Sequence, residues 1–429
     1  MAHIRSFRGI LYNPRKIKNI AKVFTEPYDV ISSLEQAAYH KSHPYNIIRL
    51  ILGKRHPADN SKNNRYTRAR KYFADWIKKD ILLRDKGENI YIYAQTFPHN
   101  NRTKTRTGFI ILLKIEDFAK NAILPHENTR SYAVQERLKL LQETGANLSP
   151  IFALFCEPQG RINKLLSRHK RGQRPCIVIK KDEVLHRIWR MSDKRKITAV
   201  QKLLRDKQIF IADGHHRYEA ALNYKLQMQK KKRGAARAAP FNYVMTYLVA
   251  TDDPGLTILP THRAIKVKGG FKLQEIISKL RKAFELRRFS TSDELFSYMR
   301  ESPAAARVFG ACFGKNKFWG LKLKSAGIVY KIIDEDKQSF HKGLDVSILH
   351  SLVIERILNI APFEKNIYYT RDAQECIKLV SEDKYQAAFF LRPLRVTQVK
   401  RAACAGRKMP HKSTYFYPKL LTGLVINKL

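Results

Sequence analysis

The residues best suited to chemistry stand between a strand and a helix in the segment Ile209–Leu222. The apolar run Ile209–Ala212 predicts a short buried strand, and Tyr218–Leu222 is typical of a helix start. A helix that begins directly after a glycine turn points backbone N–H groups and the positive end of its dipole at the turn, which favours a bound anion. The polar residues and the glycine of this turn are Asp213, Gly214, His215, His216 and Arg217.

Each residue of the turn has a defined chemical use. Gly214 allows the backbone to approach a ligand closely, and Arg217 can grip a phosphate or carboxylate with two parallel hydrogen bonds. Asp213 can hold a metal ion or a proton. The alternative is that Asp213 caps the helix and both histidines lie on the surface. The sequence leaves these two interpretations open.

Polar groups also stand beside a proline in four other segments. They are Asp29 in Glu26–Ile31, His126 and Glu127 in Leu124–Thr129, Thr261, His262 and Arg263 after Leu259–Pro260, and Lys412, Ser413 and Thr414 in Met409–Lys419. Turn chemistry explains each of them taken alone. Together they provide carboxylates for Mg²⁺ and for a general base, and fixed cations for the charge on a transferred phosphoryl group.

Other site chemistries have less support in the sequence. Histidines could indicate a zinc site, but neither H-x-x-x-H nor H-E-x-x-H spacing occurs, so oxygen ligands and Mg²⁺ are favoured over zinc. Neither the G-x-G-x-x-G pattern of dinucleotide-binding folds nor the G-x-x-x-x-G-K-[ST] pattern of P-loops is present.

The charge of the chain is extreme, with 82 Lys and Arg against 37 Asp and Glu and a net charge of +45. Such a charge can serve nucleic-acid binding. The basic residues are nevertheless scattered along the whole length, so a general lysine-rich bias on solvated faces is the favoured explanation. The densest cluster, Lys225–Arg237, is explained by an exposed helix end and loop.

The composition, at 44% hydrophobic and 10% aromatic residues, is that of a folded globular protein. No run reaches the roughly 18 apolar residues that a membrane span requires, and the N-terminus does not read as a secretory signal. The five cysteines are widely separated and form no C-x-x-C pair. We therefore expect a protein of the reduced cytoplasm, with no membrane partner and with nucleic acid as a disfavoured partner.

The predicted elements indicate a mixed α+β protein rather than a repeated βαβ unit. The segment Arg65–Leu83 has the spacing of an amphipathic helix, and Glu88–Phe97 and Arg106–Ile115 are typical of strands. Gly269–Gly270 is the best linker candidate. It divides the chain into an N-terminal domain of residues 1–268 and a smaller α+β domain of residues 271–429, whose final motif we expect to return to the site.

The chain resembles the bacterial and archaeal family known as domain of unknown function 1015 over nearly its whole length. The motifs that carry the resemblance are EPYDVIS, HPYNIIRL, LPHENT, GANLSPIF, ADGHHRYEAAL, DPGLTILPTHR and MPHKSTYFYPKLLTGLVI, which begin at Glu26, His43, Leu124, Gly145, Ala212, Asp253 and Met409. Membership of this family implies no particular activity.

A second, shorter resemblance does suggest an activity. The stretch Gly214–Ala221 is similar to the G-x-x-R-x-x-A-A phosphate-binding element of the ParB/sulfiredoxin-like superfamily, which includes partition proteins, sulfiredoxins and free serine kinases. The resemblance implies a ParB/sulfiredoxin-like core in the N-terminal domain and a phosphate site at Gly214, His215, His216 and Arg217. His215 stands where sulfiredoxins need cysteine, and no helix-turn-helix follows Gly270, so the kinase branch fits best.

These observations predict a phosphotransferase that acts on the hydroxyl of free L-serine, with ATP, ADP or pyrophosphate as donor and Mg²⁺ as cofactor. The alternative is a nucleotide- or RNA-binding regulator without transfer chemistry. Asp29 or Glu127 is the expected base, and His126 is expected to be a hydrogen-bond donor. Asp29, Glu127 and Asp213 are the candidate Mg²⁺ ligands.

The C-terminal motif is expected to contribute to the same site. Its aromatic residues Tyr415–Tyr417 would anchor it, while Lys412, Ser413 and Thr414 face the ligand. We expect Lys412 and Thr261–Arg263 to lie near Asp213–Arg217, in a cleft between the two domains. The alternative is a C-terminal strand that is packed for stability alone.

Overall fold

The structure is a computed structural model that describes residues 2–231, 238–267, 272–315, 317–325, 327–328, 344–360, 366–406, 409–410 and 412–429. The linker candidate Gly269–Gly270, the end of the basic cluster Lys225–Arg237, and His411 lie outside these residues. The chain forms two compact units. Unit 1 comprises residues 1–257 and 418–429, and unit 2 comprises residues 258–417.

Within the described residues, unit 1 is built on a mixed sheet of nine strands. In sheet order these are β6 (Ile123–Leu124), β11 (Ile209–Asp213), β8 (Ile151–Phe155), β12 (Tyr243–Ala250), β5 (Arg102–Lys114), β4 (Ile90–His99), β10 (Val184–Met191) and β9 (Ile177–Lys181), with β1 (Ile4–Arg5) also paired to β5. The pairs β6–β11 and β8–β12 are parallel, whereas β8–β11 and the others are antiparallel. The expectation of a mixed α+β fold with a large mixed sheet is confirmed.

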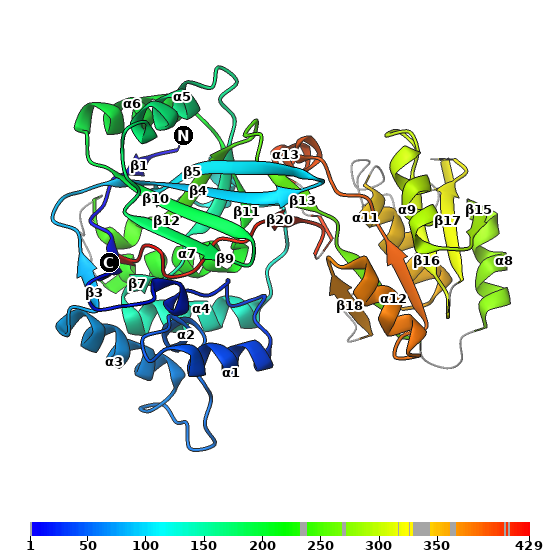
Figure 1. Cartoon of the computed structure of the whole chain (residues 1–429), viewed down its shortest axis with the longest axis horizontal. Coiled ribbons are helices and arrows are strands. Elements are labelled where there is room, and N and C mark those ends of the chain that lie inside the picture. The colour runs from blue at the N-terminus through cyan, green and yellow to red at the C-terminus, as the bar shows by residue number, and fades with distance from the viewer. Residues whose placement is uncertain are drawn as a thin grey trace. The chain divides into compact units, whose positions relative to one another are not determined.

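The helices of unit 1 lie on both sides of this sheet (Figure 1). They are α1 (Ser33–Ser42), α2 (Ile48–Ile51), α3 (Arg65–Lys78), α4 (Ser131–Thr144), α5 (Arg161–Lys170), α6 (Lys194–Leu204) and α7 (His215–Lys231). Helices α5, α6 and α7 share one buried core with alternate residues of the strands, as the period-2 pattern of a strand requires. Helix α4 packs along α7 through Val134, Leu138 and Ala220.

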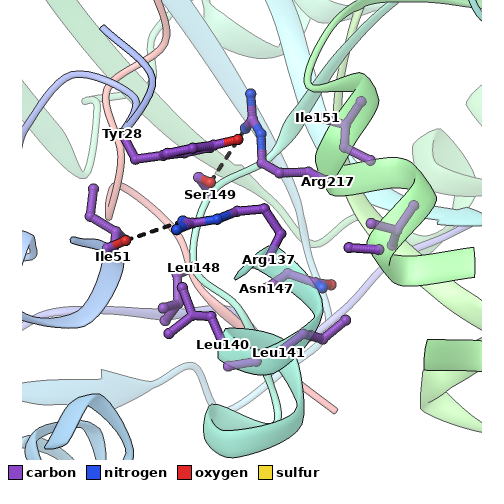
Figure 2. Close-up of a pocket in the computed structure, with 13 residues that line it drawn as sticks. Tyr28, Ile51, Arg137, Leu140, Leu141, Asn147, Leu148, Ser149, Ile151 and Arg217 are labelled. Carbon is purple, nitrogen blue, oxygen red and sulfur yellow. Dashed lines mark hydrogen bonds between the residues drawn. The ribbon is translucent and has the colours of Figure 1, made fainter. Parts of the chain in front are cut away.

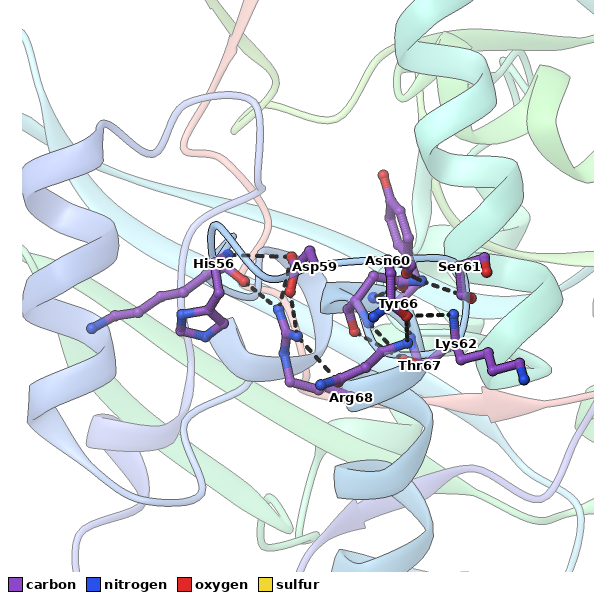
Figure 3. A network of polar contacts seen from close by, with 11 residues as sticks. His56, Asp59, Asn60, Ser61, Lys62, Tyr66, Thr67 and Arg68 are labelled. Carbon is purple, nitrogen blue, oxygen red and sulfur yellow. Dashed lines mark hydrogen bonds and ion pairs between the residues drawn. The ribbon is translucent and has the colours of Figure 1, made fainter.

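The loop before α3 is organised by its own polar groups (Figure 3). The Asn60 side chain accepts hydrogen bonds from the N–H groups of Lys62 and Asn63, and Asp59 pairs with Arg68 at 2.6 Å. Asn64 caps α3 by accepting from the N–H groups of Tyr66 and Thr67. These bonds fix where α3 begins.

The end of the chain is part of unit 1. Strand β21 (Asn427–Lys428) pairs with β7 (Ala146–Asn147), and Ile426 exchanges two backbone hydrogen bonds with Ile10 in β2 (Ile10–Tyr12), which itself pairs with β3 (Leu82–Arg84). Leu421, Leu424, Val425 and Ile426 are all buried. The last twelve residues therefore pack and pair as an integral part of unit 1.

Unit 2 has a sheet of six antiparallel strands within the described residues. In sheet order they are β15 (Phe284–Phe289), β17 (Phe318–Leu323), β16 (Val308–Cys312), β19 (Ala387–Phe390), β14 (His262–Ile265) and β18 (Ile367–Thr370). The helices are α8 (Leu273–Ala283), α9 (Ser292–Glu301), α11 (Asp345–Ile348), a π-helix (Leu349–Ile357), α12 (Ala373–Ser381) and α13 (Val396–Cys404). A separate two-stranded ladder joins β13 (Thr257–Leu259) to β20 (Tyr415–Tyr417).

Helices cover both faces of the unit 2 sheet, because two cores lie on its opposite sides. Neighbouring residues of one strand divide between these cores, as Phe389 and Phe390 do. No helix among the described residues has the length and apolarity needed to cross a bilayer.

Candidate functional site

Asp213 is the centre of the candidate site, at the last position of β11. Its two oxygens bind two different cations: Oδ1 lies 2.8 Å from Lys419 Nζ, and Oδ2 lies 2.9 Å from an Arg217 terminal nitrogen. The three side chains are largely buried, with exposed fractions of 19%, 9% and 12%. Burial alone would raise the pKa of Asp213, but the charges of Lys419 and Arg217 hold this pKa well below its usual range.

Asp213 does not cap α7. Both of its oxygens are engaged by side-chain cations, and it makes no hydrogen bond to the first N–H groups of the helix within the described residues. The structure therefore departs from the helix-cap interpretation that the sequence left open. The carboxylate instead ties the start of α7 to the C-terminal segment.

Gly214 makes the turn between strand and helix. Its φ of +93° lies in the left-handed region, and a Cβ atom here would lie 2.9 Å from the guanidinium of Arg217. Arg217 fills this space because it also bonds to Ser149 Oγ at 3.3 Å and to the carbonyl of Pro150. Glycine is thus required both for the backbone conformation and for the position of Arg217.

Two histidines face each other beside this turn. The rings of His126 and His215 are perpendicular with centroids 4.7 Å apart, and both side chains are buried. Backbone N–H of His126 donates to His215 Nε2, so the proton of neutral His215 sits on Nδ1, 3.7 Å from Glu127 Oε2. Burial lowers the pKa of His126 to about 4 and that of His215 well below its usual value, so both rings are neutral at pH 7.

His126 Nδ1 lies 2.7 Å from the carbonyl oxygen of Ile211 and donates to it. The role of His126 as a hydrogen-bond donor in the reaction stays a prediction. The rest of the same loop docks on α7. Arg130 N–H donates to His216 Nε2, and Thr129 donates to Glu219. The segments 124–130 and 213–219 thus form one polar centre, as their residue types suggested.

Asp29 lies at the edge of this centre. Its side chain is exposed and forms no hydrogen bond or ion pair with the described residues. Its neighbour Tyr28 lines a hollow together with Arg217, and burial raises the pKa of Tyr28 to about 12. Asp29 is exposed to solvent, whereas Glu127 lies beside His215. Both carboxylates remain candidates for the base.

The remaining expected site residues belong to unit 2 and form a cluster of their own. Thr261 and the start of β14, His262–Arg263, are buried. Arg263 bonds to the carbonyl groups of Thr261 and Lys412, and Ser413 donates to the carbonyl of Pro410. The expected approach of Lys412 and Thr261–Arg263 to Asp213, which would join the two units, stays a prediction.

The described residues contain no group of three or more His, Cys, Asp or Glu side chains placed to hold a metal ion. Asp213 has both oxygens bound to cations, and Asp29 is exposed without a partner among the described residues. Asp29, Glu127 and Asp213 therefore do not form a Mg²⁺ cage as they lie. A Mg²⁺ ion held mainly by ligand phosphates needs no such cage.

Several residues around Arg217 were not predicted from the sequence. Lys419 was part of the C-terminal motif, but Lys412 was chosen as its ligand-facing lysine. Tyr28, Arg137 and Ser149 line a hollow with Arg217 (Figure 2). Tyr28 and Ser149 lie inside the motifs EPYDVIS and GANLSPIF, and these motifs could have identified them as candidate site residues. Arg137 lies in none of the motifs, so the sequence does not distinguish it from other arginines.

The chain belongs to the family described as protein of unknown function, DUF1015, whose model matches residues 4–347. The C-terminal motif that begins at Met409 lies beyond the matched residues. No curated protein sequence matches the chain significantly.

Several solved structures have distant similarity. A conserved hypothetical protein from Pyrococcus furiosus is 13% identical, with 73% of this chain and 92% of that one covered and a TM-score of 0.32. A free serine kinase variant in complex with AMP is 12% identical, with 72% and 87% covered and a TM-score of 0.34. SbnI with a C-terminal truncation, from Staphylococcus aureus, is 11% identical, with 73% and 85% covered and a TM-score of 0.34. At these scores the likeness identifies neither fold nor function.

Proposed function

We propose that this protein is a small-molecule phosphotransferase that phosphorylates the hydroxyl of free L-serine, with ATP, ADP or pyrophosphate as donor. The observation that carries the proposal is the pair of cations, Arg217 and Lys419, that share one carboxylate at the N-terminus of α7. Two cations on one anion leave positive charge where the helix dipole already favours a phosphate. The similarity of Gly214–Ala221 to a phosphate-binding element points the same way, and with it we infer a ParB/sulfiredoxin-like core.

The residues of this site have separate roles in the proposed reaction. A donor phosphate would compete with Asp213 for Arg217 and Lys419, while Gly214 lets it approach the backbone. The acceptor hydroxyl loses its proton to Asp29 or Glu127 as its oxygen attacks the phosphorus. The bond from the phosphorus to the rest of the donor breaks, and ADP, AMP or phosphate leaves. His126 and His215 stay neutral and hold the loop 124–130 in place. Mg²⁺, bound through the donor, is expected as the cofactor.

The deciding experiment is to incubate the protein with L-serine, Mg²⁺ and each donor in turn and to measure O-phosphoserine. Lys419→Met should lower activity by weakening donor binding, and Arg217→Ala should do the same. Lys428→Met is the matched control, because Lys428 is an exposed lysine of the same C-terminal segment. Unchanged activity in both Lys419→Met and Arg217→Ala would show that the site is misplaced.

The base is identified by a second pair of variants. Asp29→Asn and Glu127→Gln should each leave donor binding intact, and the one that removes the base should lower turnover by roughly 10²-fold or more. Equal, full turnover in both variants would exclude both carboxylates as the base.

A second candidate function is a non-catalytic nucleotide- or RNA-binding regulator. It is favoured by a basic hollow with a cavity volume of about 240 Å³ beside the loop of Figure 3. The hollow is lined by His40, Lys41, Arg49, Gly53, Lys54, His56, Arg65, Arg68 and Tyr72. Absence of O-phosphoserine with every donor, together with salt-sensitive RNA binding or with nucleotide binding, would select this function over transfer.

A further inference from the structure

The hollow beside Arg217 has a chemical character that the proposed phosphate site does not explain. Its cavity volume is about 50 Å³, within a space of about 540 Å³ that includes open solvent. Most of its wall is apolar, from Ile51, Leu140, Leu141, Leu148, Ile151 and Val244. The polar groups that line it are Tyr28, Arg137, Asn147, Ser149 and Arg217 (Figure 2). A mostly apolar pocket with a few polar groups is typical of a small-molecule site.

Arg137 is the unusual member of this wall. It projects from α4, is only 7% exposed, and no carboxylate among the described residues lies within ion-pair distance of it. Its guanidinium carbon lies 3.8 Å from the centre of the Tyr28 ring, and one terminal nitrogen donates to the carbonyl of Ile51 at 3.1 Å. Its Nε is buried with no acceptor among the described residues. A buried cation without a counter-ion is costly, so an anion is expected to complete this arrangement.

Two other arginines among the described residues are buried without a carboxylate contact. Each donates at least two hydrogen bonds, although the Nε of Arg106 also lacks an acceptor among these residues. Arg106 donates to the side chain of Gln95 and to the carbonyl of Pro418. Arg263 donates to the carbonyl groups of Thr261 and Lys412. Neither lines this hollow. Arg137 is thus distinguished both by its single hydrogen bond within the described residues and by its position at the edge of an open space.

The remaining polar groups of the wall also suit an anion. The Tyr28 hydroxyl has no hydrogen-bond partner among the described residues, and the Ser149 hydroxyl contacts Arg217. The side-chain oxygen of Asn147 already accepts hydrogen bonds from Met245 N–H and from the side chain of Asn427. These bonds stabilise the fold, so we assign this oxygen no role in binding a ligand. The hollow therefore presents donors beside an apolar wall. This combination matches a carboxylate on an apolar body better than it matches a phosphate, which carries more charge and has no apolar part.

We propose that this hollow binds a small organic acid, with its carboxylate on Arg137 and Tyr28 and its apolar part against Leu140, Leu148 and Ile151. Since Arg217 belongs both to this wall and to the proposed phosphate site, the bound acid would be the acceptor of the transfer. Its role as acceptor rests on the proposed function, whereas its binding does not.

The test measures binding by calorimetry without any phosphate donor, so that its result is independent of transfer activity. Two matched pairs of probes separate the carboxylate from the rest of the ligand: isovalerate against isoamyl alcohol, and L-serine against ethanolamine. We expect the acid of each pair to bind and its partner to bind at least tenfold more weakly.

Arg137→Gln should weaken the binding of the acids by roughly ten- to a hundredfold, the effect of losing a charge-assisted hydrogen bond. Arg70→Gln is the matched control, because Arg70 is an exposed arginine of α3 outside the hollow and should leave binding unchanged. If Arg137→Gln does not fold, Arg137→Lys decides the question, since it keeps the charge, loses the planar fork and should still weaken acid binding.

Three results would overturn the proposal: equal binding of acid and alcohol, no binding of any acid by the folded protein, or unchanged affinity in the folded Arg137 variant. Acid binding in a protein that makes no O-phosphoserine would support the hollow and refute the proposed function. Transfer activity together with unchanged acid binding in the Arg137 variant would support the proposed function and refute the hollow as the acid site.

Discussion

At the scale of single residues, the centre of unit 1 depends on side chains whose charge states are set by burial. Asp213 stays ionised because two cations contact it. His126 stays neutral because burial lowers its pKa by more than its hydrogen bond to the carbonyl of Ile211 raises it. These two states have opposite electrostatic origins. Because folding shifts the pKa of each residue, both residues make the stability of the fold depend on pH.

Asp213→Asn should destabilise the protein by about 3 kcal/mol, because it leaves Arg217 and Lys419 without their counter-ion in a largely buried place. The folded-state pKa of Asp213 lies below the value of about 4 in the unfolded chain, so its stabilising contribution is present at neutral pH and is lost as the pH falls below about 4. Urea denaturation from pH 7 to about 2.5 should therefore show a smaller loss of stability in the variant.

The matched control is Asp75→Asn, which removes a half-exposed ion pair with Lys79 on α3 and should cost less than about 1 kcal/mol. Equal costs for the two substitutions would mean that the bridge at Asp213 is no stronger than a surface pair.

His126→Gln should flatten the dependence of stability on pH in a higher window. The unfolded chain takes up a proton near pH 6.5, whereas folded His126 does so only near pH 4, so the native protein loses stability as the pH falls between these values. The full loss attributable to His126 is about 3 kcal/mol. Denaturation midpoints measured every half pH unit give the slope.

The control for this slope is His56→Gln, which replaces an exposed histidine and should keep the wild-type slope. Some slope should remain in His126→Gln, because His215 is also buried in its neutral form. A slope identical to wild type would show that folding does not change the pKa of His126.

At the scale of elements, the junction of β11 and α7 depends on one glycine. Gly214→Ala should destabilise the protein by about 2–3 kcal/mol, since it combines the cost of a left-handed backbone with a clash against Arg217. Gly172→Ala is the matched control: its φ is +73°, but nothing lies within 4 Å of the added Cβ, so only the backbone cost of about 1 kcal/mol applies. Chemical denaturation of both variants isolates the clash, and equal losses would show that Arg217 moves aside freely.

At the scale of the whole molecule, the two units have separate buried cores. We expect calorimetry to show two unfolding transitions. Ile426→Ala should lower only the transition of unit 1 and Leu321→Ala only that of unit 2, each by about 2–5 kcal/mol, because both side chains are fully buried. A single transition moved by both substitutions would contradict independent cores.

Much of unit 1 was predictable because its signals are local. The strand, turn and helix of residues 209–222 follow from an apolar run, a glycine and a series of helix formers, and the structure has β11 and α7 there. The helix expected at Arg65–Leu83 is α3, although it ends at Lys78 because β3 begins at Leu82. The mixed α+β class and the DUF1015 family were also evident from the sequence.

The partners of these elements were set by contacts between distant segments. Lys419 binds Asp213 because the buried side chains of Leu421–Ile426 hold the last twelve residues in unit 1. Arg137 meets Tyr28 only because α4 packs against α7 and the N-terminal loop. The sequence by itself determined which segments carry reactive groups, since residue type and local conformation are local properties. Only the tertiary structure decided which groups meet and which are buried, because burial and pairing depend on the packing of the whole chain.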